Sequence, residues 1–170
     1  MNNMMKVYIV NPSTHKLTTV EEWAKEKDPK AARLVAIAYE NGDVLYISKN
    51  KAEKNMKWPE AMKYAEAFTT PEINIPFRAP SRREALDMTD AKDLGIMEAL
   101  DLIGGNALSP DWYWTNERIS HWLAARYDAD YVWNYSGNSG NINSNYFYNA
   151  LTVVPVALYS PSVYEKIARG

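Results

Sequence analysis

The chain has 170 residues, of which 46% are hydrophobic and 24% charged, enough to bury the core of one globular domain. Its net charge of −2, with scattered lysines, argues against a nucleic-acid partner, and no apolar run approaches the roughly 20 residues that span a bilayer. Cysteine is absent, which excludes disulfides and thiolate metal sites, and the N-terminal residues lack a signal-peptide pattern. We therefore expect synthesis in a reducing cytoplasm, with a virion or a cell surface open as the place of action.

The first 50 residues predict a strand, a short helix and a hairpin. Residues 5–10 are β-rich and precede a turn. Residues 19–22 have the spacing of a helix capping box, which predicts a short helix that continues to about Lys27, before Pro29. Two β-rich runs within residues 33–49 flank an Asn-Gly dipeptide, which accepts positive φ at both turn positions and predicts a tight hairpin.

Helices dominate the next part of the chain. Trp58–Phe68 opens with proline near the first helical position and places its apolar residues on one face. Ser81–Glu84 is a second capping box, and residues 85–103 have a helical pattern with a break near Thr89-Asp90. Gly104-Gly105 predicts the end of this segment, because glycine is the usual residue after a helix.

After Gly105 the pattern changes to short strands and long loops. We expect strands at residues 111–115, 131–133 and 151–159, and a short helix or helical turn over residues 119–127. Pro155 cannot donate to a strand ladder, so it should lie at a bulge or on an unpaired side. Because no linker or long repeat divides the chain, residues 1–170 are expected to form one α+β domain, with residues 1–50 and 51–170 as its two parts.

Residues 131–164 contain no Asp, Glu, Lys, Arg or His, although a quarter of the whole chain is charged. Within them, residues 134–150 are rich in Asn, Tyr, Ser and Gly, the composition of antibody loops, in which tyrosine gives rigid contact area and the small polar residues give adaptable hydrogen bonds. The same composition is also typical of plain turns. The residues alone therefore leave a recognition surface and an ordinary surface loop as alternatives.

Four motifs occur in an order that resembles the C-type lectin-like domain of bacterial and phage proteins. They are WPEAMKYA at residues 58–65, RAPSRREA at 78–85, YWT at 113–115 and VVPV at 153–156, and together they span about residues 50–160. The resemblance implies an α+β fold in which two helices flank a twisted, mostly antiparallel sheet with long loops and the terminal strands lie together. Val154 stands where the family has arginine. The calcium-binding tripeptides of animal C-type lectins are absent, so calcium-dependent sugar binding is not expected.

Within this fold the chain most resembles the variable proteins of diversity-generating retroelements. In those proteins an error-prone reverse transcriptase randomises adenines, usually in AAY codons for asparagine, and the variable side chains form a ligand-binding face. Such changes reach Asn, Tyr, Ser, Gly, Ile, Phe and Asp but never Lys, Glu, Gln, Met or Trp, and residues 134–150 contain none of those five. The resemblance implies a binding face made of Trp133, Asn134, Tyr135, Ser136, Asn138, Asn141, Asn143, Asn145, Tyr146 and Tyr148.

These residues predict a non-enzymatic binding protein with no cofactor and no metal. Its ligand is expected to be a protein or glycan on a cell surface, with a homo-oligomer or a carrier protein as a further partner and no insertion into a membrane. Tyr135, Tyr146 and Tyr148 are the expected hot spots, whose loss should abolish binding without changing stability. The alternative is a prophage structural or assembly protein in which the same fold carries an inert loop.

An enzyme is the third hypothesis. The chain lacks a Gly-x-Ser-x-Gly elbow, a phosphate loop, a dinucleotide fingerprint and a zinc-binding His-Glu-x-x-His helix, and formylglycine-generating relatives of this fold need cysteine. A hydrolase would have to use His121 with a carboxylate cluster of Asp111, Asp128 and Asp130, which are more typical of turns. Four tryptophans, at positions 112, 114, 122 and 133, fit either a sugar-stacking platform or, for at least two of them, core packing.

Overall fold

A computed structural model describes residues 5–119, 131–146 and 148–161 of the chain. The expected short helix over residues 119–127 lies almost entirely outside them, as do His121, Trp122, Asp128 and Asp130. Helices and two antiparallel sheets make up the described part, so the expected α+β class is confirmed. None of its helices has the length and apolar character that crossing a bilayer demands.

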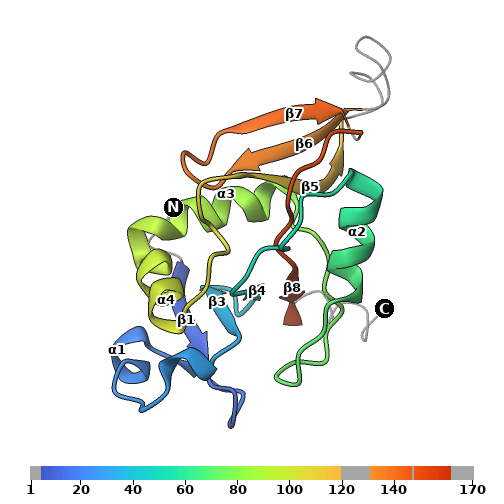
Figure 1. Ribbon diagram of the computed structural model, residues 1–170. Coiled ribbons are helices and arrows are strands. Elements are labelled where there is room, and N and C mark those ends of the chain that lie inside the picture. Colours follow the sequence, from blue (N-terminus) through green and yellow to red (C-terminus); the bar gives the residue numbers. More distant parts are fainter. Residues whose placement is uncertain (1–4, 120–130, 147, 162–170) are drawn as a thin grey trace.

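Strands and short helices come in runs up to residue 103, and the named elements of the described part after it are strands (Figure 1). The large sheet has the order β2-β1-β3-β4-β8, and the small sheet has the order β5-β6-β7. Their bounds are β1 (Met5–Val10), β2 (Leu17–Thr18), α1 (Val20–Trp23), η2 (Pro29–Ala31), β3 (Leu34–Tyr39), β4 (Val44–Ser48), α2 (Trp58–Ala67), α3 (Arg82–Asp90), η3 (Ala91–Leu94), α4 (Ile96–Ile103), β5 (Trp112–Arg118), β6 (Tyr131–Ser136), β7 (Ile142–Tyr146) and β8 (Val156–Tyr159).

The first strand and the β3–β4 hairpin occur where the sequence predicts them, but the turn of the hairpin differs. Gly42 has a φ of 95°, whereas Asn41 does not have positive φ. The Tyr39 carbonyl accepts from the Gly42 N–H at 3.0 Å, and the Tyr39 N–H donates to the Asp43 carbonyl at 2.9 Å. The turn therefore has three residues and ends on one left-handed glycine, so only Gly42 of the dipeptide uses the positive φ that both residues accept.

Both helix signals in residues 58–104 are confirmed. Ser81 and Glu84 form a complete capping box at the start of α3, and the predicted break lies at Asp90, where α3 gives way to η3. The helix α4 ends at Gly104. The early helix α1 is shorter than expected, since it ends at Trp23 rather than near Lys27.

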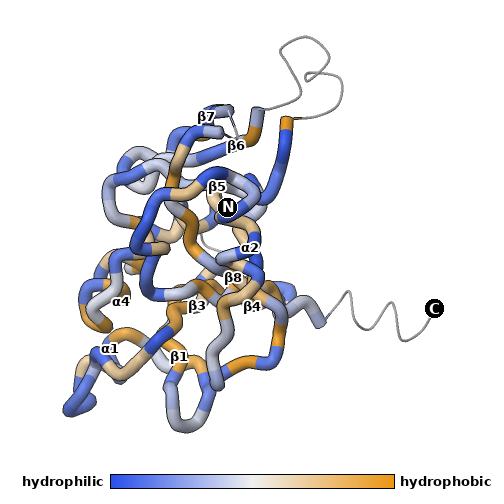
Figure 2. Tube along the Cα trace, turned by 45° about the vertical axis from the view of Figure 1, so that its right-hand side comes forward, coloured by the Kyte–Doolittle hydropathy of each residue, from blue (hydrophilic) through white to orange (hydrophobic). Residues whose placement is uncertain are grey.

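The large sheet is buried on both faces. One face packs on α3, η3 and α4 through a core that includes Ile37, Ile47, Met88 and Leu100. The other face is covered by the segment after α2, through residues 68–77. Figure 2 shows the resulting contrast, with apolar colouring in the strands of the large sheet and polar colouring in β6 and β7.

The small sheet sits over α3 and beside α2 (Figure 1). Its strand β5 is held by residues 151–153: the Trp114 N–H donates to the Thr152 carbonyl at 2.9 Å, and the Trp114 indole donates to the Met56 carbonyl at 2.8 Å. The predicted strand over residues 151–159 is thus divided into a bridge to β5 and the strand β8. Pro155 lies between these two parts, at an interruption of the ladder as expected.

The strand order contradicts one feature that the resemblance implied. Strands β1 and β8 belong to the same sheet, but β3 and β4 lie between them. The first and last described strands therefore do not pair, because the β3–β4 hairpin is inserted as the centre of the sheet.

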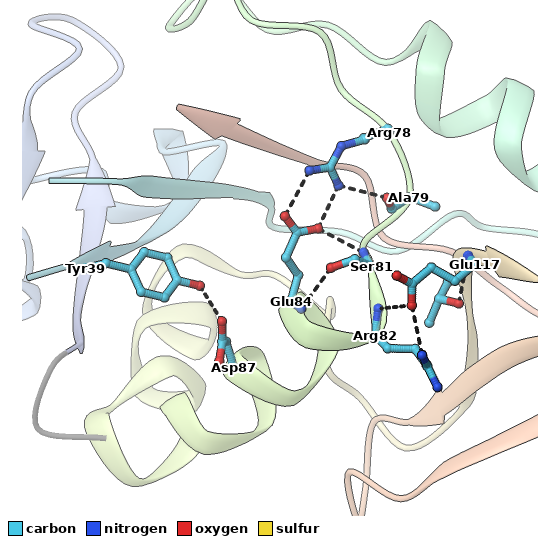
Figure 3. Close-up of polar contacts among 9 residues, drawn as sticks. Tyr39, Arg78, Ala79, Ser81, Arg82, Glu84, Asp87 and Glu117 are labelled. Atoms are coloured by element: carbon cyan, nitrogen blue, oxygen red, sulfur yellow. Dashed lines mark hydrogen bonds and ion pairs between the residues drawn. The ribbon is translucent and has the colours of Figure 1, made fainter. Parts of the chain in front are cut away.

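A half-buried ion pair connects the start of α3 to the segment that leads into it (Figure 3). Arg78 binds Glu84 through two hydrogen bonds of 2.6 and 2.9 Å, and Glu84 also accepts from the Ser81 N–H. Burial favours the neutral carboxyl, but these donors outweigh it and hold the pKa of Glu84 below its ordinary value. The pair therefore stabilises the fold above the pKa of an unfolded glutamate and loses that effect as the pH falls through the lower, folded-state value.

We predict that Glu84→Gln lowers the free energy of unfolding at pH 7 by about 2 kcal/mol, since it leaves Arg78 partly unpaired. Denaturant unfolding across pH should show this difference shrinking below about pH 4, where wild-type Glu84 is also becoming protonated. Glu66→Gln, on the exposed side of α2, is the control and should change stability little at any pH. A difference that stays constant down to pH 3 would contradict the assigned role.

Candidate ligand-binding surface

The asparagine-rich tract forms a β-hairpin rather than a loop. Strand β6 pairs antiparallel with β7 in a regular register that sets Asn134 opposite Asn143 and Val132 opposite Asn145. Because side chains alternate along a strand, Asn143 and Asn145 face one side of the sheet while Ile142, Ser144 and Tyr146 face the other. The alternation Ile-Asn-Ser-Asn-Tyr over residues 142–146 is the sequence signal for this strand, and the loop interpretation missed it.

The turn between β6 and β7 is fixed to the helices below it. The Lys92 ammonium of η3 donates to the carbonyls of Gly137 and Asn138. The Ser136 hydroxyl accepts from the backbone N–H groups of Asn138 and Ser139, at 3.3 and 3.2 Å. Side chains and backbone from two elements thus hold the turn in one position.

Gly140 brings the same turn into contact with α3. It has a φ of 74°, which a residue with a side chain rarely adopts. A Cβ at this position would also clash with the Thr89 side chain. The turn therefore depends on glycine for both its backbone conformation and its close approach to the helix.

Three of the expected binding residues are buried, so the prediction that they face a ligand was wrong. The exposed fractions are 2% for Asn134, 0% for Tyr135 and 8% for Ser136. The reason is that β6 is the central strand and both of its faces are covered: Tyr135 packs in the cluster that includes α3 and α4, and Asn134 lies opposite the buried Trp114. Tyr135 stacks on Tyr113 of β5 with 5.1 Å between ring centroids and belongs to the main core.

Burial also sets the chemistry of this tyrosine. It raises the pKa of Tyr135 well above its ordinary value, so the phenol stays neutral. Within the described part of the chain, its hydroxyl and the Asn134 side-chain oxygen have no hydrogen-bond partner. Such a hydroxyl adds nothing to stability, and the ring carries the contribution of the residue.

Trp133 is half-buried because an arginine covers its ring. The Arg82 guanidinium at the start of α3 lies 4.6 Å from the ring centroid, and its Nε donates to Glu117 at 2.9 Å. Only part of the indole is therefore open to a ligand.

The remaining predicted residues lie along β7 and beyond its two ends, with Asn143 and Asn145 on one face of the sheet and Tyr146 on the other. Asn138, Asn141 and Asn143 are exposed, Asn145 is half-buried, and Tyr146 and Tyr148 are 40% and 56% exposed. We call this set of six, Asn138, Asn141, Asn143, Asn145, Tyr146 and Tyr148, the exposed patch. Tyr146 is supported from below by Tyr131, with 4.3 Å between the ring centroids. The exposed patch combines amides with two aromatic rings and carries no charge.

The described residues provide few of the side chains that a hydrolytic or metal site would need. Asp111 binds Lys51 at 3.2 Å, and no group of three or more His, Cys, Asp or Glu there is arranged to hold a metal. The expected tryptophan platform is also divided, because Trp114 is fully buried whereas Trp112 is 38% exposed. A cavity of about 630 Å³ lies elsewhere, beside α2, and none of the exposed patch lines it.

Comparison with protein-family models and with curated proteins gives no match to the chain.

We predict opposite effects for two substitutions of Tyr135. Tyr135→Ala should lower the free energy of unfolding by about 3–5 kcal/mol, because it leaves a cavity in the core. Tyr135→Phe should keep or slightly raise stability, since the hydroxyl it removes has no partner. Thermal and denaturant unfolding measure both. A loss of more than about 1 kcal/mol in Tyr135→Phe would show that the hydroxyl makes a stabilising hydrogen bond.

Proposed function

We propose that this protein is a non-enzymatic binding protein of the C-type lectin-like type, which presents the exposed patch to a protein or glycan on a cell surface. Among such proteins, the variable proteins of diversity-generating retroelements fit its residues best. The observation that carries the proposal is the combination of an uncharged, amide-rich and aromatic hairpin with a backbone held at Gly137, Asn138 and Gly140.

A fixed backbone matters for binding because ordering a loop costs free energy at the moment of contact. In the exposed patch that cost is reduced, since Lys92 and Ser136 already hold the turn. Tyrosine loses little side-chain entropy and buries a large area, and asparagine both donates and accepts hydrogen bonds. The same frame can therefore carry different side chains without refolding, which a diversified surface needs.

The positions of the four motifs support the resemblance. Residues 58–65 lie on α2, residues 78–85 lead into α3, residues 113–115 lie on β5, and residues 153–156 precede and enter β8. Two of them lie on α2 and at the start of α3, and the small sheet sits beside the first helix and over the second (Figure 1). The separation of β1 from β8 is a departure from that fold and leaves its finer type a proposal.

The distribution of asparagine agrees with diversification. Exposed or half-buried positions on the hairpin hold Asn138, Asn141, Asn143 and Asn145, where new side chains can be accommodated. Asn134 is the exception, since it is buried beside Trp114 and Asn143 in the sheet register. A randomised codon at that position would place side chains of different size in a buried site and would destabilise the fold.

The alternative is a prophage structural or assembly protein with the same fold and an inert hairpin. DNA sequence separates the two. A nearby, near-identical repeat that differs from the codons of residues 134–150 only at adenines, together with a reverse transcriptase gene, supports diversification. Absence of such a repeat from the complete genome favours the structural role.

We predict that the double variant Tyr146→Ala/Tyr148→Ala loses binding to intact cells that the wild-type protein labels in a panel of bacterial strains. Removal of each aromatic hot spot should cost about 2 kcal/mol or more, so the loss of both should weaken the affinity by about 800-fold or more. Fluorescence of cells incubated with labelled protein measures the change. The matched control is Tyr64→Ala, which removes a 41% exposed tyrosine from α2.

Circular dichroism should show that all these variants remain folded. Equal binding by the double variant and by Tyr64→Ala would contradict a role of the exposed patch in recognition. Labelling of no strain by the wild-type protein, across a panel that includes the host and its relatives, would favour the inert hairpin.

A further inference from the structure

Each sheet has two outer edges, and three of these four are short or covered. Strand β2 has only two residues. The outer side of β8 is bridged by Arg78, whose N–H and carbonyl both bond Val156 at 2.8 Å. The outer side of β5 is bridged by Thr152. Among the described residues, no strand or bridge pairs with the outer edge of β7 (Figure 1).

The backbone of β7 offers hydrogen-bonding groups at that edge. The Asn141 carbonyl accepts from the Ser136 N–H at 3.0 Å, so residues 141, 143 and 145 direct their backbone groups toward β6. The intervening residues 142, 144 and 146 therefore direct theirs outward, where the Tyr146 carbonyl already accepts from the Asn149 N–H at 3.0 Å and keeps one lone pair for a further donor. An edge of this kind is a template for another strand.

Local side chains now occupy the outward N–H groups. The Ser144 N–H donates to the side-chain oxygen of Asn143 at 2.8 Å, and the Tyr146 N–H donates to that of Asn145 at 2.9 Å. These oxygens belong to the residue just before each donor, so a turn of the asparagine side chain releases the N–H. At Asn145 that turn also breaks the hydrogen bond that its oxygen accepts from the Asn149 side chain. A strand carbonyl can then replace the amide.

The usual protections of an edge strand are missing from β7. Residues 142–146 read INSNY, with no lysine, no other charge and no proline, and the pairing of β7 with β6 has no bulge. An uncharged edge has one further property: it can meet a copy of itself without repulsion between like charges.

We propose that β7 pairs antiparallel with β7 of a second copy of this chain, about a two-fold axis at Ser144. The two small sheets then join into one six-stranded sheet, β5-β6-β7-β7-β6-β5. In this register Ile142 of each copy lies opposite Tyr146 of the other copy, so this pair occurs twice on one face of the joined sheet. Asparagine lies opposite asparagine on the other face, because residue 143 meets residue 145. Aromatic residues opposite β-branched ones, and amides opposite amides, are favourable cross-strand pairs.

A second copy fits this edge better than a foreign strand does. The strand INSNY is self-complementary in size and polarity about its central serine, as an isologous interface requires. It carries no charge with which to select a particular foreign peptide. Because only five residues pair, the interface is small and the dimer should be reversible and dependent on concentration.

The dimer also changes the exposed patch, a consequence that rests on the proposed function. The turn at residues 138–141 and the ring of Tyr148 lie at opposite ends of β7 in one chain. Antiparallel pairing brings the turn of one copy toward Tyr148 of the other. Two patches then act together in one assembly, which raises the apparent affinity for a repeated ligand.

A single cysteine tests the register, because the chain has none of its own. In the proposed pair the Cα atoms of residue 144 lie about 5.5 Å apart, within disulfide range. Ser144→Cys should therefore give a covalent dimer under mild oxidation, at least about tenfold faster than Ser139→Cys. Ser139 is an exposed serine of the turn, and its two copies would lie on the order of 30 Å apart. Equal rates for the two variants would overturn the proposal.

Sedimentation equilibrium tests the dimer without cross-linking. The wild-type protein should show a monomer–dimer equilibrium, and Ser144→Lys should raise its dissociation constant by about tenfold or more, since like charges would meet at the axis. Ser13→Lys, in an exposed turn of the large sheet, should leave the constant unchanged. A wild-type protein that stays monomeric at its highest soluble concentration would overturn the proposal, even if it still binds cells.

Discussion

The stacking of Tyr135 on Tyr113 ties the small sheet to the main core, and the exposed patch depends on it. Both rings are fully buried, and both belong to the cluster that contains the apolar residues of α3 and α4. Burial of rings of this size is a large favourable term. The strand β6 is thereby fixed along its length, and β7 takes its position from β6 through a regular register. A hairpin that two strands alone would not stabilise becomes part of the folded domain.

Lys92 and Gly140 then fix the turn between β6 and β7. Lys92 binds two carbonyls of the turn, and Gly140 lets the backbone lie against Thr89. The strand and its turn are therefore set by residues outside the exposed patch, whereas the patch side chains point to solvent or lie at the edge. This separation of frame from contact residues is what a surface that changes its side chains requires. It is also why Asn134 and Tyr135 belong to the frame, although they lie within the same uncharged tract.

Much of the fold was predictable from local signals with a direct physical cause. The capping box at Ser81, the break after Asp90 and the interruption at Pro155 each follow from backbone chemistry that acts within a few residues. The hairpin at residues 34–48 was predicted, but its turn type was not, because the choice between a two- and a three-residue turn depends on the register of the flanking strands. The separation of β1 from β8 is a long-range feature that no local pattern reports.

The exposed patch was predicted only in part. Composition identified the tract, yet it does not say which of its residues face inward, and the depth of β6 in the sheet made Tyr135 a core residue. The period-two alternation of residues 142–146 would have identified β7 and its exposed asparagines. The contact of Arg82 with Trp133 joins residues far apart in sequence, so no motif could have predicted that the indole is half-covered.

The central claim is that a rigid frame presents the exposed patch, and backbone order in solution tests it most directly. Nuclear-spin relaxation should give order parameters near 0.85 for the amides of residues 136–146, equal to those of the large sheet. Values below about 0.6 across the turn and β7 would mean that the hairpin is flexible, and the account of a preformed contact surface would then fail.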